Sequence, residues 1–148
     1  MDNKVKMEAH SLLDTPRVLL VEDNVIAQKV EKNLLQTLGC EVDVAENGEG
    51  SLLLFAPGKY DVIFMDIGLQ DTSGYIVAKK IREQESGTDY HVPIIALTSY
   101  KAEAVKHDCR EYFMAGAITK PLTMDQAEQI IQYYIYDKDV MVEGLVSA

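Results

Sequence analysis

The sequence predicts an α/β domain in which helices cover both faces of a parallel sheet. Apolar runs of strand length alternate along the chain with segments that show helical periodicity. This alternation favours a parallel sheet, because successive strands are then joined by right-handed helical crossovers. The longer apolar runs are continuous, as expected for strands that are buried on both faces. The same runs end in polar residues, which points to a site at one edge of the sheet.

The elements are expected in strict alternation. Strands are expected at 17–22, 41–45, 60–66, 92–98 and 117–119, and helices at 24–38, 48–55, 73–84, 102–114 and 124–136. Gly39 lies where a helix C-terminus favours a positive φ, and Pro57 ends the second helix. The inner face of the first helix is expected to consist of Ala27, Val30, Leu34 and Leu38.

The bulk composition limits both architecture and function. A chain of 148 residues forms one domain, with 1–16 as a linker or extension, 17–136 as the domain and 137–148 as a C-terminal tail or linker without firm periodicity. A net charge of −10 argues against a nucleic-acid surface. No apolar run could span a bilayer, so no membrane contact is expected. Cys40 and Cys109 are interpreted as reduced thiols, which suits the cytoplasm.

Polar side chains follow the strands that are expected at the centre of the sheet. Glu22 and Asp23 follow the first strand, Asp66 the third, Thr98 the fourth and Lys120 the fifth. The carboxyl ends of parallel strands share one edge of a sheet, and ligands bind there. We therefore expect these five side chains to form one site.

These residue types suit phosphoryl transfer. The carboxylates of Glu22, Asp23 and Asp66, with the backbone carbonyl of Gly68, are the oxygen ligands that Mg²⁺ prefers. Asp66 can also attack phosphorus and hold the group as an aspartyl phosphate. The Lys120 ammonium and the Thr98 hydroxyl can then neutralise and hydrogen-bond the phosphoryl oxygens.

Four short segments carry a family resemblance. Val21-Glu22-Asp23-Asn24, Met65-Asp66-Ile67-Gly68-Leu69, Ala96-Leu97-Thr98-Ser99 and Ile118-Thr119-Lys120-Pro121-Leu122 resemble the receiver domain of two-component response regulators, most closely the receiver module of hybrid sensor histidine kinases. The resemblance implies a flavodoxin-like (βα)5 fold with strand order 2-1-3-4-5. It also implies Mg²⁺-dependent phosphorylation of Asp66 from phosphohistidine, readout through Thr98, and a cis Lys120–Pro121 bond.

The resemblance also implies partners. These are a histidine kinase or histidine phosphotransfer domain, and a second copy of the chain that binds through the face that the family builds from helix 4, strand 5 and helix 5. We expect an exposed Val25, beside Leu122, to dock the helices that present the phosphohistidine. The location implied is cytoplasmic.

Three positions depart from the family pattern. Gln70 stands where many relatives have proline, so a looser loop is expected. Phe113 stands where relatives often have glycine. Ala117 occupies the place of the usual switch aromatic, three residues before Lys120. Tyr112 or Phe113 is the expected substitute for that ring.

Two other functions remain open. A haloacid-dehalogenase-like phosphatase would use Asp66 as its nucleophile, but Gly68 and Tyr100 next to the expected site offer no further acid or base. A degenerate receiver would act only in protein contacts, which the complete set of five site residues disfavours. The favoured function is a switch that catalyses its own phosphorylation and dephosphorylation, with any kinase activity in another domain.

Overall fold

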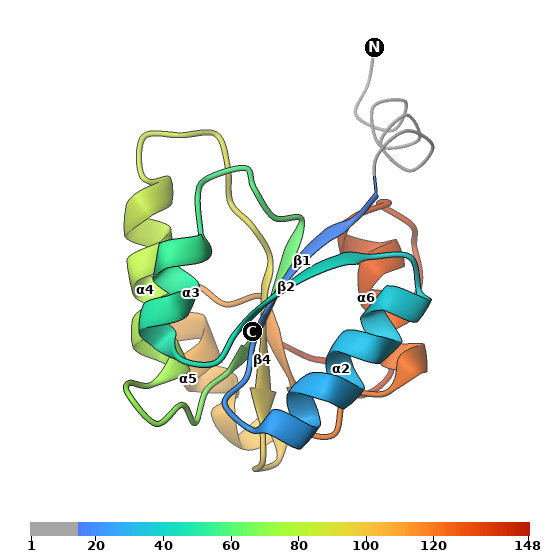
Figure 1. Cartoon of the computed structure of the whole chain (residues 1–148). Coiled ribbons are helices and arrows are strands. Elements are labelled where there is room, and N and C mark those ends of the chain that lie inside the picture. The colour runs from blue at the N-terminus through green and yellow to red at the C-terminus, as the bar shows by residue number, and fades with distance from the viewer. Residues whose placement is uncertain (1–14) are drawn as a thin grey trace.

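The structure is a computed structural model that describes residues 15–148, so nearly all of the expected extension 1–16 lies outside the described residues. A central sheet has the strand order β2-β1-β3-β4-β5-β6 (Figure 1). The strands are β1 (Arg17–Val21), β2 (Glu41–Ala45), β3 (Val62–Asp66), β4 (Ile94–Thr98), β5 (Gly116–Thr119) and β6 (Val146–Ser147). Strands β1 to β5 are parallel, in the predicted order 2-1-3-4-5. The flavodoxin-like prediction is therefore confirmed.

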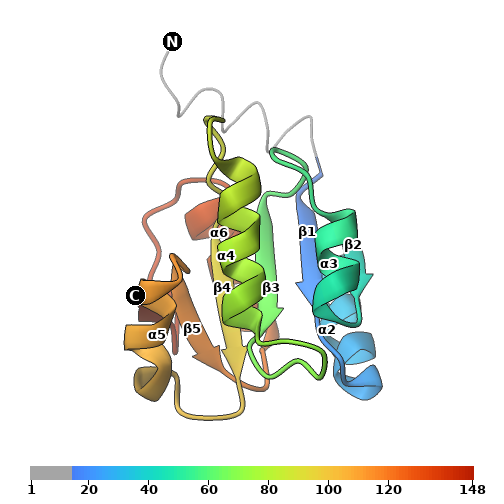
Figure 2. The same cartoon turned by 90° about the vertical axis from the view of Figure 1, so that its left-hand side faces the viewer.

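Helices cover both faces of the sheet. Figure 2 shows α3 (Gly48–Leu54), α4 (Gly74–Glu85) and α5 (Lys106–Glu111) on the face toward the viewer, and α2 (Val25–Thr37) and α6 (Met124–Tyr134) on the other. A short 3-10 helix, η1 (Ala102–Val105), precedes α5. No helix among residues 15–148 combines the length and apolar character needed to cross a membrane.

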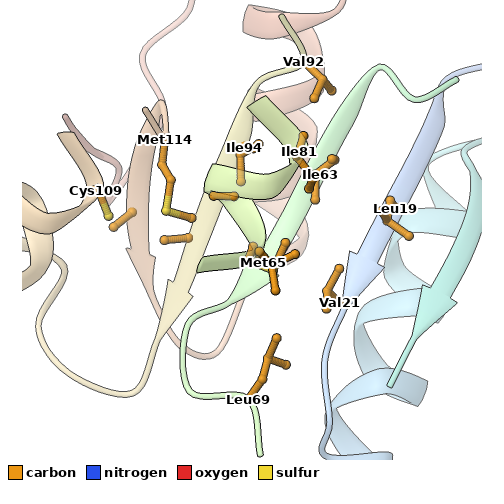
Figure 3. Packing of buried hydrophobic residues seen from close by; sticks show 14 of the residues in the cluster. Leu19, Val21, Ile63, Met65, Leu69, Ile81, Val92, Ile94, Cys109 and Met114 are labelled. Carbon is orange, nitrogen blue, oxygen red and sulfur yellow. The ribbon is translucent and has the colours of Figure 1, made fainter. Parts of the chain in front are cut away.

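The sheet separates two apolar cores because successive strand residues point to opposite faces. One core cluster contains Leu19, Met65 and Ile94 of the sheet, Ile81 of α4 and Cys109 of α5 (Figure 3). On the opposite face the core contains Val18, Leu20, Phe64, Leu34, Leu35, Ala127, Ile130 and Ile131. Both cysteines are buried free thiols.

The tail differs from expectation, since it supplies a sixth strand. Segment 137–148 was expected to be a tail or linker without firm periodicity, yet β6 pairs antiparallel with β5, Val146 opposite Ala117 and Ser147 opposite Gly116. The predicted count of five strands is therefore one short. A two-residue strand has no periodicity of its own, so only its partner could reveal it.

The inner face of α2 was predicted with one wrong member. Val30 is exposed, and the buried positions are Glu31, Leu34 and Leu35. Neighbouring helix positions differ by about 100°, so the apolar pattern fitted Val30 while packing turned Glu31 inward.

The segment predicted as one helix at 102–114 is broken. It begins as η1, and α5 ends at Glu111. Beyond it, Phe113 has a φ of 59°, a left-handed conformation that glycine adopts more easily. The Arg82 guanidinium donates to the Phe113 carbonyl from Nη2 at 2.8 Å and from Nε at 3.1 Å. Arg82 thus holds the turn that joins α5 to β5.

Candidate functional site

The strand ends bring three carboxylates together. Val21 pairs with Met65 across β1 and β3, which places Glu22 level with Asp66. One oxygen from each of Glu22, Asp23 and Asp66 lies within 4.8 Å of the other two. All five parallel strands point to this edge of the sheet (Figure 2). The acidic cluster that the sequence led us to expect is therefore present.

Lys120 joins the cluster from β5. Its Nζ lies 2.9 Å from Glu22 Oε1 and 3.2 Å from Asp66 Oδ2. The peptide bond between Lys120 and Pro121 is cis, as predicted. One ammonium therefore bridges the acid that follows β1 and the acid that ends β3.

The charges shift the ionisation of both ion-pair partners. Burial raises the pKa of Glu22, although Lys120 and the Asn24 amide oppose the shift. Burial lowers the pKa of Lys120, but its hydrogen bond to Glu22 and the negative charges of Asp66 and Glu22 outweigh burial, so the net pKa is raised. Lys120 therefore stays cationic through the neutral range.

Backbone groups fix the acids in place. The Gly68 amide donates to Asp66 Oδ1 at 2.8 Å, and the Asn24 amide donates to Glu22 Oε2 at 3.2 Å. Gln28 Nε2 donates to the Glu22 carbonyl at 2.6 Å. Gly68 therefore contacts Asp66 through its N–H group. The role of its carbonyl as a Mg²⁺ ligand stays a prediction.

Thr98 ends β4, the strand next to Asp66. It is almost fully buried. Its Oγ1 accepts a hydrogen bond from the Tyr100 amide at 3.0 Å, and its carbonyl accepts one from the Lys120 amide at 2.8 Å. The hydroxyl proton is not used in this bond, so Thr98 keeps a donor for an anion at the site.

Glu31 was not predicted as a residue of the site. This acid on α2 is buried beneath the site, and burial together with the charge of Glu22 raises its pKa to about 8. Its Oε1 has no hydrogen-bond partner among the described residues. Glu31 is therefore protonated at neutral pH, and the only signal in the sequence was an acid within the apolar pattern of α2.

The loop after Asp66 is tied at both ends. A Cβ at Gly74 would lie 2.5 Å from the Asp66 carbonyl oxygen, so the start of α4 packs directly on the phosphoacceptor candidate's backbone. Asp71 accepts from the Gly48 amide at 2.9 Å and from the Glu49 amide at 3.1 Å. The bond from Gly48 is the main cause that lowers the Asp71 pKa. We expected a loose loop because Gln70 replaces the usual proline, but the next residue, Asp71, anchors this loop to the start of α3.

The expected docking pair is corrected in part. Val25 is 58% exposed, but Leu122 is only 3% exposed and packs among the core residues of α6. Leu122 is therefore a core residue and offers no docking surface. The exposed apolar neighbours of Val25 are Ile26 and Val30, all on α2.

Comparisons with known proteins agree on one family. The family model described as "Response regulator receiver domain" matches residues 18–132. Hybrid signal transduction histidine kinase L from Dictyostelium discoideum is 36% identical over 124 residues, covering 80% of this chain and 7% of that protein. Aerobic respiration control sensor protein ArcB from Escherichia coli K12 is 34% identical over 120 residues, covering 79% of this chain and 15% of that protein. The chain thus spans a small part of these relatives.

Solved structures agree with the fold. The Saccharomyces cerevisiae receiver domain of Ssk1, crystallised with the histidine phosphotransfer protein Ypd1, has a TM-score of 0.74 and 28% identity, covering 82% of this chain and 89% of that one. The receiver domain of sensor histidine kinase PA1611 from Pseudomonas aeruginosa, with a magnesium ion in its active-site cleft, has a TM-score of 0.72 and 33% identity, covering 82% and 98%.

Proposed function

This chain belongs to the response regulator receiver domain family, and from that premise we propose that Asp66 is its phosphoacceptor and that the phosphoryl donor is a phosphohistidine. The observation that carries the proposal is the contact of Lys120 Nζ with Asp66 Oδ2 at 3.2 Å and with Glu22 Oε1 at 2.9 Å. A cation beside a fixed carboxylate is what an aspartyl phosphate needs to form.

The residues fit a magnesium ion. Glu22, Asp23 and Asp66 offer hard oxygen donors within 4.8 Å of one another, and we propose the Gly68 carbonyl as a further ligand. Bound Mg²⁺ supplies positive charge that offsets the negative charge of a phosphoryl group. The magnesium ion in the related PA1611 receiver domain supports this assignment.

The chain's own residues position the transfer. An Asp66 carboxylate oxygen forms the new O–P bond while the P–N bond to the imidazole breaks and its electron pair returns to the ring. The Gly68 amide holds Asp66 Oδ1 in place. Lys120 lies ready to neutralise one phosphoryl oxygen, and the Thr98 hydroxyl donates to another.

The docking partner is assigned from the surface next to the site. Val25, Ile26 and Val30 form an exposed apolar patch on α2, and we propose that a histidine kinase or histidine phosphotransfer domain binds there. The complex of the related Ssk1 receiver domain with Ypd1 supports a partner of this class. A homodimer through α5, β5 and α6, which are the family's helix 4, strand 5 and helix 5, and a cytoplasmic location stay predictions.

The test uses acetyl phosphate with Mg²⁺ and intact mass spectrometry. We expect wild type, and the exposed control Asp89→Asn, to gain the mass of one phosphoryl group, and Asp66→Asn to gain none. A label on Asp66→Asn would overturn the assignment. Continuous release of phosphate from a small phosphomonoester would favour the phosphatase alternative, and no labelling of wild type would favour the degenerate receiver.

A further inference from the structure

The C-terminal tail is built onto the free edge of β5. Val146 pairs with Ala117 and Ser147 with Gly116, and the Ala148 amide donates to the Ala115 carbonyl at 3.1 Å. Val146 and Ala148 pack against the core on the α4 and α5 side, whereas Leu145 packs against the α6 side. The tail therefore lies along the edge strand, with partly buried apolar side chains on both faces of the sheet.

The tail strand pairs with Gly116 and Ala117, which we call its seat, and this seat requires glycine at position 116. A Cβ at Gly116 would lie 2.7 Å from the Val146 carbonyl oxygen and 2.9 Å from Leu145 Cδ1, and the nearest atoms all belong to the tail. Any side chain at position 116 would thus collide with the tail. The side chain opposite Val146 is the methyl group of Ala117, so neither residue obstructs the strand.

Two glutamines of α6 hold the start of the tail strand. Gln126 Nε2 donates to the Glu143 carbonyl at 3.1 Å, and Gln129 Oε1 accepts from the Glu143 amide at 2.8 Å. Gly144 follows with a φ of 75°, which turns the chain into the edge. The hydrogen bonds to Glu143 and the close contact at Gly116 show that the sequence specifies this position of the tail.

Short covalent and hydrogen-bonded paths join the tail to the Asp66 site. Strand β5 carries the tail at 116 and 117 and ends beside Lys120. Thr119 Oγ1 accepts from the Ala102 amide at 2.8 Å, which connects β5 to the segment that follows Thr98. Gln126 also closes the capping box with Thr123, three residues after Lys120. Both attachments of the tail are therefore connected to Thr98 and Lys120 by a few residues and hydrogen bonds.

We propose that the β5 edge is a strand-binding surface, that Leu145–Ala148 is its built-in occupant, and that phosphorylation of Asp66 loosens this strand. The proposal rests on the proposed function of Asp66. A phosphoryl group on Asp66 changes the ion pairs of Lys120, which now contacts Glu22 Oε1 and Asp66 Oδ2 and directly follows β5. A two-residue ladder is among the weakest elements of a sheet, so it opens first when β5 is disturbed.

An uncovered β5 edge can accept an extended apolar segment in antiparallel alignment. Strand addition of this kind takes its affinity from main-chain hydrogen bonds and its specificity from alternate side-chain pockets. The shape of the surface is given by its present occupant, a strand with Val146 and Ala148 on one face and Leu145 on the other. The phosphorylated domain would therefore expose a binding surface that the unphosphorylated domain covers.

Backbone amide exchange tests the coupling on the whole chain. Residues 145–148 are followed by NMR before and after acetyl phosphate and Mg²⁺, with intact mass recorded on the same samples. We expect the exchange to be at least about fivefold faster in the phosphorylated chain, the lower end of common coupling between sites. Unlabelled chain would overturn the function of Asp66 and the inference with it. Labelled chain with unchanged exchange would overturn the inference alone.

Matched substitutions test the contribution of the β5 residue Gly116 and that of the tail residue Val146 separately. Gly116→Val and Val146→Asp should each give fast exchange at 145–148 without phosphorylation, while Met141→Asp, at an 88% exposed tail position, should behave as wild type. A fluorescent peptide of residues 140–148 should bind Val146→Asp, whose own tail is released while Gly116 and Ala117 are unchanged, but not wild type or Gly116→Val. Equal peptide binding to all three would contradict a strand-binding edge.

Discussion

Replacing Glu31 by glutamine should reduce the pH dependence of the domain's stability. Glu31 is only 4% exposed, and burial together with the charge of Glu22 raises its pKa from 4.5 to about 8. The folded chain therefore keeps a proton on Glu31 at pH values where the unfolded chain releases it. Stability from this group is fully present below pH 4.5 and is lost as the pH rises through about 8.

The size of the effect follows from the shift. Each pKa unit corresponds to about 1.4 kcal/mol, so the full shift bounds the loss of unfolding free energy at about 4–5 kcal/mol. Relaxation around a buried carboxylate reduces this value, and we expect wild type to lose roughly 2–4 kcal/mol between about pH 5 and 9. The buried Glu22, whose pKa is raised as well, adds a slope of the same sign that remains in the variant.

Urea unfolding in EDTA measures this loss across the same pH range. The unfolding free energy of Glu31→Gln should fall less steeply with pH than that of wild type, so the two lines diverge as the pH rises. Glu128→Gln, at an exposed position of α6, is the control and should run parallel to wild type. A Glu31→Gln line parallel to wild type would refute the assignment of a protonated Glu31.

Three further substitutions test other parts of the structure. Phe113→Gly should raise the unfolding free energy by about 1 kcal/mol, since the left-handed φ of 59° strains a side chain that is mostly exposed; a lower value in urea unfolding would contradict this. Gly74→Ala should lower the unfolding free energy by about 2 kcal/mol and slow the phosphorylation of Asp66, because the new Cβ meets the Asp66 carbonyl. Unchanged phosphorylation and unchanged stability would count against that contact. Lys120→Met should cost about 2–3 kcal/mol in EDTA by leaving Glu22 and Asp66 unpaired. Added Mg²⁺ should narrow that deficit, because a bound cation replaces the lost charge, and a deficit that Mg²⁺ leaves unchanged would contradict a cation site.

Local signals explain what the sequence could predict. The alternation of apolar runs with helical patterns was sufficient for the parallel sheet, and residues such as Asn24 and Ser73 cap helices in the way their side chains allow. Because parallel strands all end at one edge, the residue after each run located Glu22, Asp66 and Lys120 together. These features depend on neighbours in the chain, which a single sequence displays.

Features set by distant contacts were missed. The choice between Val30 and Glu31 for the inner face of α2 depends on how the helix rotates against the sheet. Leu122 is buried because it packs against core residues of α6. The short strand β6 exists only through its pairing with β5. In each case the deciding atoms belong to another element.

The two edges of the sheet are protected in different ways, and this difference accounts for the tail. Edge strands with unpaired backbone groups invite association unless charges or a covering segment block them. The outer strand β2 exposes Glu41 and Asp43, so charge guards it. Strand β5 carries Gly116 and Ala117 with no charged residue, and the tail covers it instead. The family match ends at residue 132, yet the seat lies within it at Gly116 and Ala117. The small residues of β5 and the strand beyond the match therefore belong together. Without the tail the β5 edge has unpaired backbone groups, and without the small residues the tail strand has no place to bind.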